Sequence, residues 1–259
     1  MLNKYNAFIF DLDGTIYRGE NLIPRSDLVV NKLKELGKKV VFISNKTTGS
    51  VDDYFNFLFR KGLNIEKEEI INSTVVTQEF LMNNHPGEYY FAIGERTFIN
   101  EINKIGLVFT SDPLKTKIVL VTLDRTLDYS KLEVAAKALE NGARFYAANI
   151  DDTCPVEGGE IMDAGSIITA LEKRTHLKLE KHFGKPSEFM MNKINSLIKI
   201  DSQECLLIGD RVETDIAMGN KFNIDTALVS TGVTNFLNGK VRPTYKIKSV
   251  YDILQRKVK

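Results

Sequence analysis

The sequence of 259 residues lacks several features that mark membrane, secreted and nucleic-acid-binding proteins. Its longest apolar runs, such as the one around Val119–Thr122, are far shorter than the roughly 20 residues of a membrane-spanning helix. Residues 1–10 contain one lysine and no small-residue cleavage site, unlike a signal peptide. With 35 Lys and Arg against 34 Asp and Glu, the net charge of +1 offers no basic surplus for nucleic acid. We therefore expect a cytoplasmic protein with neither a membrane nor a nucleic acid as its partner.

Side chains that bind transition metals or form disulfides are also scarce. Cys154 and Cys205 are the only cysteines and lie far apart, so neither a disulfide framework nor a zinc site is expected. The three histidines are scattered without the spacing of metal ligands. Apolar residues make up 43% of the chain and charged residues 27%, as in ordinary globular proteins. A chain of this length can bury a full core in one large domain or two smaller ones.

Short apolar runs alternate with helical patterns along the chain. Ala7–Phe10 and Val40–Ile43 have the pattern of buried strands, and Ser26–Leu36 between them has helical spacing. Such alternation predicts parallel strands joined by helical crossovers. The other expected strands are Ile70–Ile71, Tyr89–Ile93, Ile118–Leu123, Phe145–Ala148, Cys205–Ile208 and Thr226–Val229. The other expected helices are Val51–Lys61, Thr74–Met82, Ser130–Glu140, Gly165–Arg174, Phe189–Ile198 and Thr214–Lys221.

The alternating pattern restarts near Pro86, which suggests an insertion. We expect an α/β core formed by residues 1–79 and 182–259, interrupted by a second α/β unit over residues 80–181. Within the insertion, residues 149–165 are rich in Gly and Asp and predict a long functional loop.

Polar residues follow three of the expected core strands. Because ligands bind at the carboxyl ends of strands in open parallel sheets, these residues should converge on one crevice. The residues that follow the strands are Asp11, Asp13, Ser44, Asn45, Asp210 and Asp215, and Lys185 is added from the start of a helix. Clustered carboxylates repel one another unless a cation neutralises them, and oxygen ligands suit Mg²⁺. A magnesium ion, a lysine and free backbone N–H groups together describe a phosphate site.

Residues 11–15, Asp-Leu-Asp-Gly-Thr, resemble the DxDGT signature of the haloacid dehalogenase (HAD) superfamily of phosphatases. Ser44, Lys185 and residues 209–215 are similar to its second, third and fourth motifs and occur in the same order. Resemblance to the NagD-like or p-nitrophenyl-phosphatase branch is carried by residues 121–129, 165–167 and 184–187. One departure is Lys46, where the family usually has a second Asn. This lysine alters the anchoring of the loop or adds positive charge near the cleft.

The resemblance implies a Rossmann-like, doubly wound parallel-sheet core with an inserted α/β cap of the C2 type, as in subclass IIA. It also implies Mg²⁺-dependent hydrolysis of small phosphomonoesters through an aspartyl-phosphate. Asp11 would be the nucleophile, and Asp13 would protonate the leaving group and later take a proton from water. Lys185 would stabilise the negative charge of the transition state.

The same resemblance implies the ligand sets. The residues implied for the substrate phosphate are Gly14, Ser44, Asn45 and Lys185. Those implied for Mg²⁺ are Asp11, Asp210 and the backbone carbonyl of Asp13, with Asp215 orienting water or the groups behind them. Asp215 also suits the first turn of the Thr214–Lys221 helix, where a carboxylate is favourable.

Two other functions remain open: a phosphotransferase or mutase using the same intermediate, and a non-catalytic protein that binds a phosphorylated metabolite. The binding protein would be expected to lack Asp11 or Asp13, and both are present. The insertion should govern substrate choice, and a homodimer formed through it is compatible with this branch. Candidate residues for contact with a small phosphorylated metabolite are Arg125, Asn149, Asp151 and Glu157.

Overall fold

The computed structural model describes residues 1–156, 158–232 and 240–255, and the chain divides into two compact units. The core unit comprises Met1–Ser44, Val51–Ile71 and Lys185–Lys259. The inserted unit comprises Asn45–Ser50 and Asn72–Gly184. It begins earlier than residue 80 because the helix α3 (Ser73–Asn84) is continuous.

A six-stranded sheet forms the centre of the core unit. Its strands, in spatial order, are β15 (Tyr245–Ile247), β14 (Asp225–Val229), β13 (Cys205–Gly209), β1 (Ala7–Asp11), β4 (Lys39–Ser44) and β5 (Ile70–Asn72). The central strand β1 is parallel to both of its neighbours, β4 and β13. A short hairpin, β2 (Tyr17–Arg18) and β3 (Asn21–Leu22), follows β1. A short helix near the end of the chain, α9 (Asp252–Gln255), also belongs to this unit.

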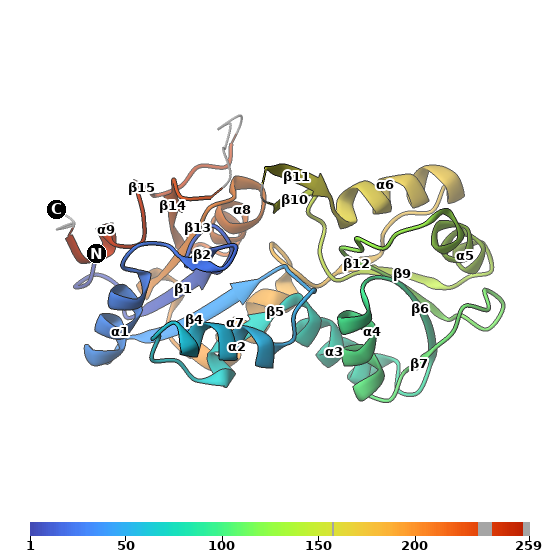
Figure 1. The fold of residues 1–259 in the computed structure, drawn as a ribbon, viewed down its shortest axis with the longest axis horizontal. Helices are drawn as coiled ribbons and strands as arrows, with labels where there is room; N and C mark the ends of the chain where they lie inside the picture. Colours follow the sequence, from blue (N-terminus) through green and yellow to red (C-terminus); the bar gives the residue numbers. More distant parts are fainter. Residues whose placement is uncertain (157, 233–239, 256–259) are drawn as a thin grey trace. The chain divides into compact units, whose positions relative to one another are not determined.

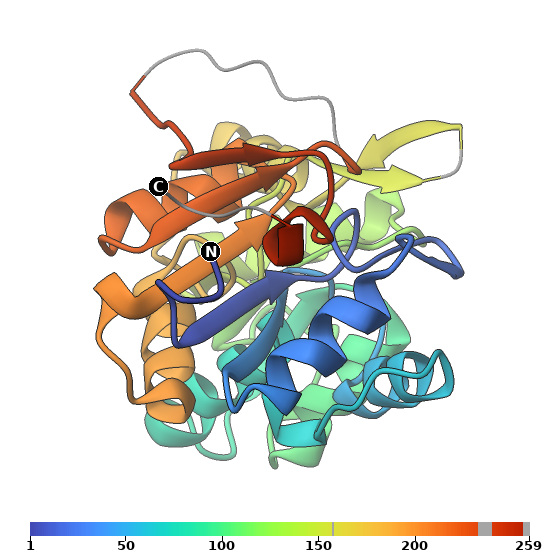
Figure 2. The same ribbon diagram turned by 90° about the vertical axis from the view of Figure 1, so that its left-hand side faces the viewer.

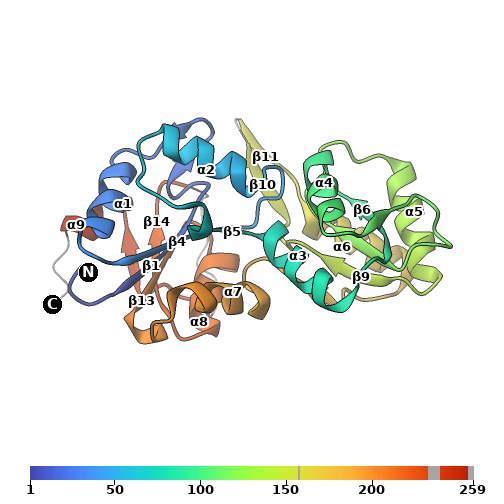
Figure 3. The same ribbon diagram turned by 90° about the horizontal axis from the view of Figure 1, so that it is seen from below.

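Helices cover both faces of the core sheet. The helices α1 (Ser26–Glu35) and α2 (Val51–Arg60) lie on one face, and α7 (Glu188–Ile198) and α8 (Ala217–Lys221) lie on the other (Figures 2 and 3). This arrangement is the predicted Rossmann-like, doubly wound fold.

The alternation of side chains along the central strands explains why both faces are covered. Phe8, Phe10 and Phe42 point to one face and stack, with ring centroids 6.0–6.4 Å apart along the series. They belong to a buried cluster that includes Leu33 of α1. Ile9, between the two phenylalanines, points to the opposite face and is also fully buried. Strands that are apolar on both faces need helices on both sides to exclude water.

The inserted unit has its own sheet and its own core. Its five parallel strands, in spatial order, are β12 (Lys181–His182), β9 (Arg144–Ala147), β8 (Ile118–Val121), β6 (Tyr89–Ile93) and β7 (Val108–Phe109). The helices α5 (Tyr129–Glu140) and α6 (Ala164–Thr175) lie on one face, and α3 and α4 (Arg96–Lys104) lie on the other (Figure 1). A separate apolar cluster is formed by side chains of its strands with those of α5 and α6.

Two sequence expectations differ from the structure. The stretch 149–165, expected as a loop, contains an antiparallel hairpin of β10 (Thr153–Val156) and β11 (Gly159–Met162). The sequence did not reveal it, because each strand has only four residues and the pair includes a proline and a glycine, which are uncommon within strands. Helix α4 was also missed, although Phe98 and Ile102 lie four residues apart and both are buried. Among the described residues, no helix is long and apolar enough to cross a membrane.

Candidate active site at the switch point of the core sheet

Three adjacent strands of the core sheet end in polar residues at the same edge. Asp11 is the last residue of β1, Ser44 is the last residue of β4, and Asp210 directly follows β13. Asp11 pairs in register with Ile43, the residue before Ser44. Strands β4 and β5 extend the sheet on one side of β1, and β13, β14 and β15 extend it on the other. Ligand sites in open α/β sheets form at such a switch point.

The turn after β1 brings backbone against Asp210. Gly14 has a φ of +85°, and its N–H donates to the carbonyl oxygen of Tyr17 at 2.7 Å. A Cβ at position 14 would collide with the carboxylate of Asp210, so glycine is required for both the dihedral angle and the space. Gly232 approaches Asp210 equally closely, and the Thr231 hydroxyl donates to the carbonyl oxygen of Gly14 at 2.6 Å. The Asp210 carboxylate is therefore held between two backbone segments.

The fourth motif follows β13 as a π-helical turn, Val212–Ile216, before α8 begins. Asp215 lies in this turn and is completely buried. Its Oδ2 accepts a hydrogen bond from the Arg211 N–H at 3.0 Å. A Cβ at Gly209 would collide with the Asp215 side chain, so this glycine makes room for the carboxylate. Single π-helical turns occur often at functional sites.

Lys185 joins two of these carboxylates. Its Nζ lies 2.5 Å from Oδ1 of Asp11 and 2.6 Å from Oδ1 of Asp215. The lysine is only 3% exposed, so these ion pairs lie away from bulk water. Because this ammonium is the cation that both carboxylates share, loss of the lysine would leave two buried negative charges without their partner.

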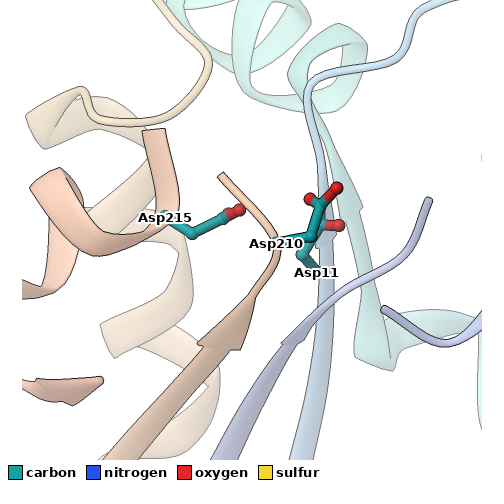
Figure 4. A group of neighbouring side chains, drawn as sticks. All are labelled: Asp11, Asp210 and Asp215. Atoms are coloured by element: carbon teal, nitrogen blue, oxygen red, sulfur yellow. The ribbon is translucent and has the colours of Figure 1, made fainter. Parts of the chain in front are cut away.

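The carboxylates of Asp11, Asp210 and Asp215 form a buried acidic cluster, in which one ligand atom of each lies within 4.8 Å of the others. Figure 4 shows Asp215 directed from its turn toward Asp11 and Asp210. Three negative charges against the single positive charge of Lys185 leave a net charge of −2. The residual charge and the all-oxygen donor set fit a hard divalent cation such as Mg²⁺.

The pKa values of Asp11 and Lys185 are both raised, but for different reasons. Burial raises the pKa of Asp11 well above its usual range, repulsion from Asp215 and Asp210 adds to this effect, and Lys185 opposes it in part. Burial alone would lower the pKa of Lys185, but the charges of Asp11 and Asp215 outweigh it and raise that pKa. The lysine thus stays charged, and a cation bound at the acidic cluster would favour the ionised form of Asp11.

The structure therefore brings together Asp11, Lys185, Asp210 and Asp215, with Gly14 packed against them. Two other predicted residues have different surroundings. Asp13 is half-buried, forms a backbone bridge with Tyr17, and is not part of the acidic cluster. Asn45 belongs to the inserted unit, where its amide donates to Asp151 at 2.8 Å.

The residues expected to contact a substrate's leaving group are mostly engaged within the inserted unit. Asn149 is 2% exposed, and its amide donates to Asp151 and Asp163. The Arg125 guanidinium makes two contacts with the carboxylate of Glu95, at 2.5 and 2.8 Å. Glu157 lies outside the described residues.

Sequence reasoning missed the approach of Thr231 and Gly232 to the site. The signal was available, because these two residues follow the expected strand Thr226–Val229 as Asp210 follows Cys205–Ile208. A strand end with a hydroxyl and a glycine is a common loop, however, and only the sheet order places it beside β13.

A doubly wound sheet that places a lysine and three carboxylates at its switch point is suited to phosphoryl transfer, which requires positioned charge. Comparison with known proteins also indicates a phosphoryl-transfer enzyme. Residues 8–108 match the family described as haloacid dehalogenase-like hydrolase, and residues 182–253 match a related HAD-hydrolase-like family. The sugar-phosphatase AraL of Bacillus subtilis is 33% identical over 250 residues, which cover 95% of this chain and 91% of that protein.

Similar solved structures are also phosphatases. A 4-nitrophenylphosphatase from Thermotoga maritima superposes with a TM-score of 0.90 at 27% identity, covering 98% of both chains. A glycerol phosphate phosphatase from Mycobacterium tuberculosis, solved with magnesium, has a TM-score of 0.84 at 25% identity, covering 97% of this chain and 77% of that one. The chain belongs to the haloacid dehalogenase-like hydrolase family. It is a phosphatase of that family, as the motifs predicted, and its structural neighbours include a putative NagD protein.

Proposed function

We propose that this chain hydrolyses small sugar phosphates and related phosphomonoesters, with Asp11 as the nucleophile. The observation that carries the proposal is the buried pairing of Lys185 with Asp11 and Asp215 beside Asp210. Relatives named as sugar phosphatases support the substrate class. Substrate choice is assigned to the inserted unit, which has its own sheet and core.

In the first step, one carboxylate oxygen of Asp11 attacks phosphorus, the bond to the ester oxygen breaks, and an aspartyl-phosphate forms. Asp13 donates a proton to the departing oxygen. In the second step, water attacks phosphorus and gives a proton back to Asp13, while the bond to Asp11 breaks and inorganic phosphate leaves. Lys185 stabilises the charge that spreads over the phosphoryl oxygens in both steps.

Ser44, at the end of β4, and the backbone N–H of Asn45 would hold phosphoryl oxygens, and Gly14 lets the backbone turn close to the phosphate. Mg²⁺ would be held by Asp11, Asp210 and the backbone carbonyl of Asp13, with Asp215 behind them. When bound, it would neutralise charge on the carboxylates and on the phosphate. The magnesium in the mycobacterial neighbour supports this assignment.

A phosphate-release screen of the purified protein tests the proposal. The panel comprises sugar phosphates, nucleoside monophosphates, phosphoglycolate and pyridoxal phosphate, each with Mg²⁺ or with EDTA. We expect magnesium-dependent release with sugar phosphates ranked highest. A folded protein that releases no phosphate from any compound would contradict the proposal. The same purified sample, measured by light scattering, tests the predicted homodimer.

Replacing Asp13 with Ala should affect poor leaving groups most. Without its proton donor, the enzyme should lose about 10²-fold or more in kcat for sugar phosphates, a typical contribution of general acid catalysis. The loss should be much smaller for p-nitrophenyl phosphate, because p-nitrophenolate leaves without protonation. Steady-state rates of both substrates measure this difference, and Asp13→Asn serves as the shape-matched variant. Equal losses for the two substrates would contradict the role of Asp13 as the acid.

Replacing Asp210 with Asn keeps the shape of the side chain and removes one charge from the acidic cluster. Because the amide is a weaker ligand for a hard cation, the Mg²⁺ concentration for half-maximal activity should rise about tenfold or more. Magnesium titration of the rate, with calorimetric titration of the metal, measures this change. An unchanged metal requirement would exclude Asp210 as a ligand.

A further inference from the structure

A hydrogen-bond network of buried and half-buried side chains in the inserted unit includes residues of the two chain segments that lead into the active site. We call it the anchor network, and its members are Asn45, Thr47, Thr122, Asn149, Asp151 and Asp163. All six belong to the inserted unit, and Ser44 and Lys185 of the core unit adjoin that unit in sequence.

One half of the anchor network is built on carboxylates. Oδ2 of Asp151 accepts from the amide of Asn45 at 2.8 Å and from the amide of Asn149 at 3.1 Å. The Asn149 amide also donates to Oδ1 of Asp163 at 3.0 Å. Asp163 in turn accepts a hydrogen bond of 2.6 Å from the backbone N–H of Ala164, the first residue of helix α6. Asn45 is thereby connected to a regular element of the inserted unit.

The other half is built on two buried hydroxyls. Thr122, at 0% exposure, donates to Oδ1 of Asn149 at 2.9 Å. A hydroxyl has a single proton, so the 2.6 Å contact between Thr122 and Thr47 must have Thr47 as the donor. The segment after Ser44 is therefore held at Asn45 and again at Thr47.

The segment before Lys185 packs against the anchor network. The Gly184 N–H donates to the carbonyl oxygen of Ala148 at 2.7 Å. A Cβ at position 184 would lie 2.5 Å from Oδ1 of Asn45 and 2.8 Å from that carbonyl oxygen, so Gly184 is packed directly against Asn45. The residue after Ser44 and the residue before Lys185 are thus held at one place.

We propose that the anchor network is a positioning device for the phosphatase site, with Thr122 and Asn149 as positioning residues for Ser44 and Lys185. The inference rests on the proposed function. Each of these two site residues is one peptide bond away from a residue held by the network. Misplacement of catalytic groups by about 1 Å can cost 10²-fold in rate, so a relaxed anchor lowers turnover without removing any group that touches substrate.

Thr122 gives the sharpest test, because it is fully buried and because two substitutions separate the effect of its hydroxyl from the effect of its shape. Thr122→Val keeps the shape and removes the hydroxyl, whereas Thr122→Ser keeps the hydroxyl. We expect Thr122→Val to lower kcat about tenfold or more while KM changes less than threefold, and Thr122→Ser to stay within threefold of the wild type. A change in KM alone, or equal rates for both variants, would overturn the proposal.

A matched control separates positioning from general loss of stability. The Tyr90 hydroxyl is buried in the same unit and lies 3.0 Å from both the carbonyl oxygen of Ile99 and Oδ1 of Asn103, so its one proton is shared between these two acceptors. Tyr90→Phe should lower the thermal midpoint to a similar extent as Thr122→Val and leave kcat unchanged. If Thr122→Val does not fold, Thr47→Val, which removes the partner hydroxyl of Thr122, is judged by the same criteria.

Hydrogen exchange measures the anchoring without any activity. Peptides covering residues 44–50 and 180–187 should exchange faster in Thr122→Val than in the wild type, and at the wild-type rate in Tyr90→Phe. Unchanged exchange in Thr122→Val would overturn the proposal. If the wild-type protein released no phosphate, the proposed function would fail, while the exchange data would still decide whether the network anchors these segments.

Discussion

Asp11→Asn is expected to release phosphate at less than about 1% of the wild-type rate, because losses of 10²-fold or more are typical when a catalytic group is removed. The amide has the shape of the carboxylate but cannot form an acyl phosphate. Rates with p-nitrophenyl phosphate and with the best sugar phosphate of the screen measure the loss. Both substrates should be affected, since bond formation at Asp11 precedes departure of either leaving group. Residual activity well above this limit would exclude Asp11 as the nucleophile.

The same variant should fold normally. Burial raises the pKa of Asp11 well above its usual range, which means that the folded protein disfavours the ionised carboxylate. A neutral side chain avoids this cost near neutral pH, and Lys185 keeps its contact with Asp215. The thermal midpoint in EDTA should therefore equal or exceed that of the wild type. A much lower midpoint would mean that lost activity reflects unfolding.

Lys185→Met is expected to have the largest combined effect on stability and rate. It leaves the carboxylates of Asp11 and Asp215 buried without their shared cation, and breaking a buried ion pair typically costs about 3–5 kcal/mol of folding free energy. The rate should fall about 10²-fold or more, since the variant also loses positive charge at the transferred phosphoryl group. Urea unfolding in EDTA and steady-state rates with Mg²⁺ measure the two effects.

The ion pair of Lys131 with Asp124 offers a matched control. Its Nζ–Oδ2 distance is 2.7 Å, but the lysine side chain is 26% exposed, against 4% for Lys185. Lys131→Met should lower stability less, because it leaves only one carboxylate without its cation and the buried Asp124 keeps two hydrogen bonds from Thr126. It should also leave phosphate release unchanged. Equal losses of stability in the two variants would contradict the special importance of Lys185 for the acidic cluster.

Regular elements with strong apolar patterns were predictable from sequence. The strand Tyr89–Ile93 has the predicted bounds, and the central strand Ala7–Asp11 differs from the prediction by one residue. Such segments bury both faces, so their composition alone reveals them. The hairpin β10–β11 was predicted as a loop, because its four-residue strands contain a proline and a glycine and have no continuous apolar run.

The candidate site was predictable for a different reason. Asp11 and Asp210 follow strands whose ends must meet in a parallel sheet, and the order of four motifs resembles one family. Asn149 and Arg125 show the limit of this reasoning. Their polarity suggested contact with substrate, which stays a prediction, and the structure adds that Asn149 is bonded within the anchor network and that Arg125 pairs with Glu95. A polar residue in a loop has the same sequence signal whether it faces a ligand or a neighbouring side chain.

The sequence by itself determined the fold class, the phosphatase family and the residue types of the catalytic centre, because each depends on local pattern and on the order of motifs. Only the tertiary structure decided that the carboxylates of Asp11 and Asp215 share Lys185 as their partner. Lys185 is 174 residues from Asp11 along the chain, yet the two lie in direct contact. Only the tertiary structure could likewise link Asn45 to Asp151 and Thr47 to Thr122. Such contacts arise from packing between distant segments, where burial strengthens charge pairs and requires every polar group to find a partner.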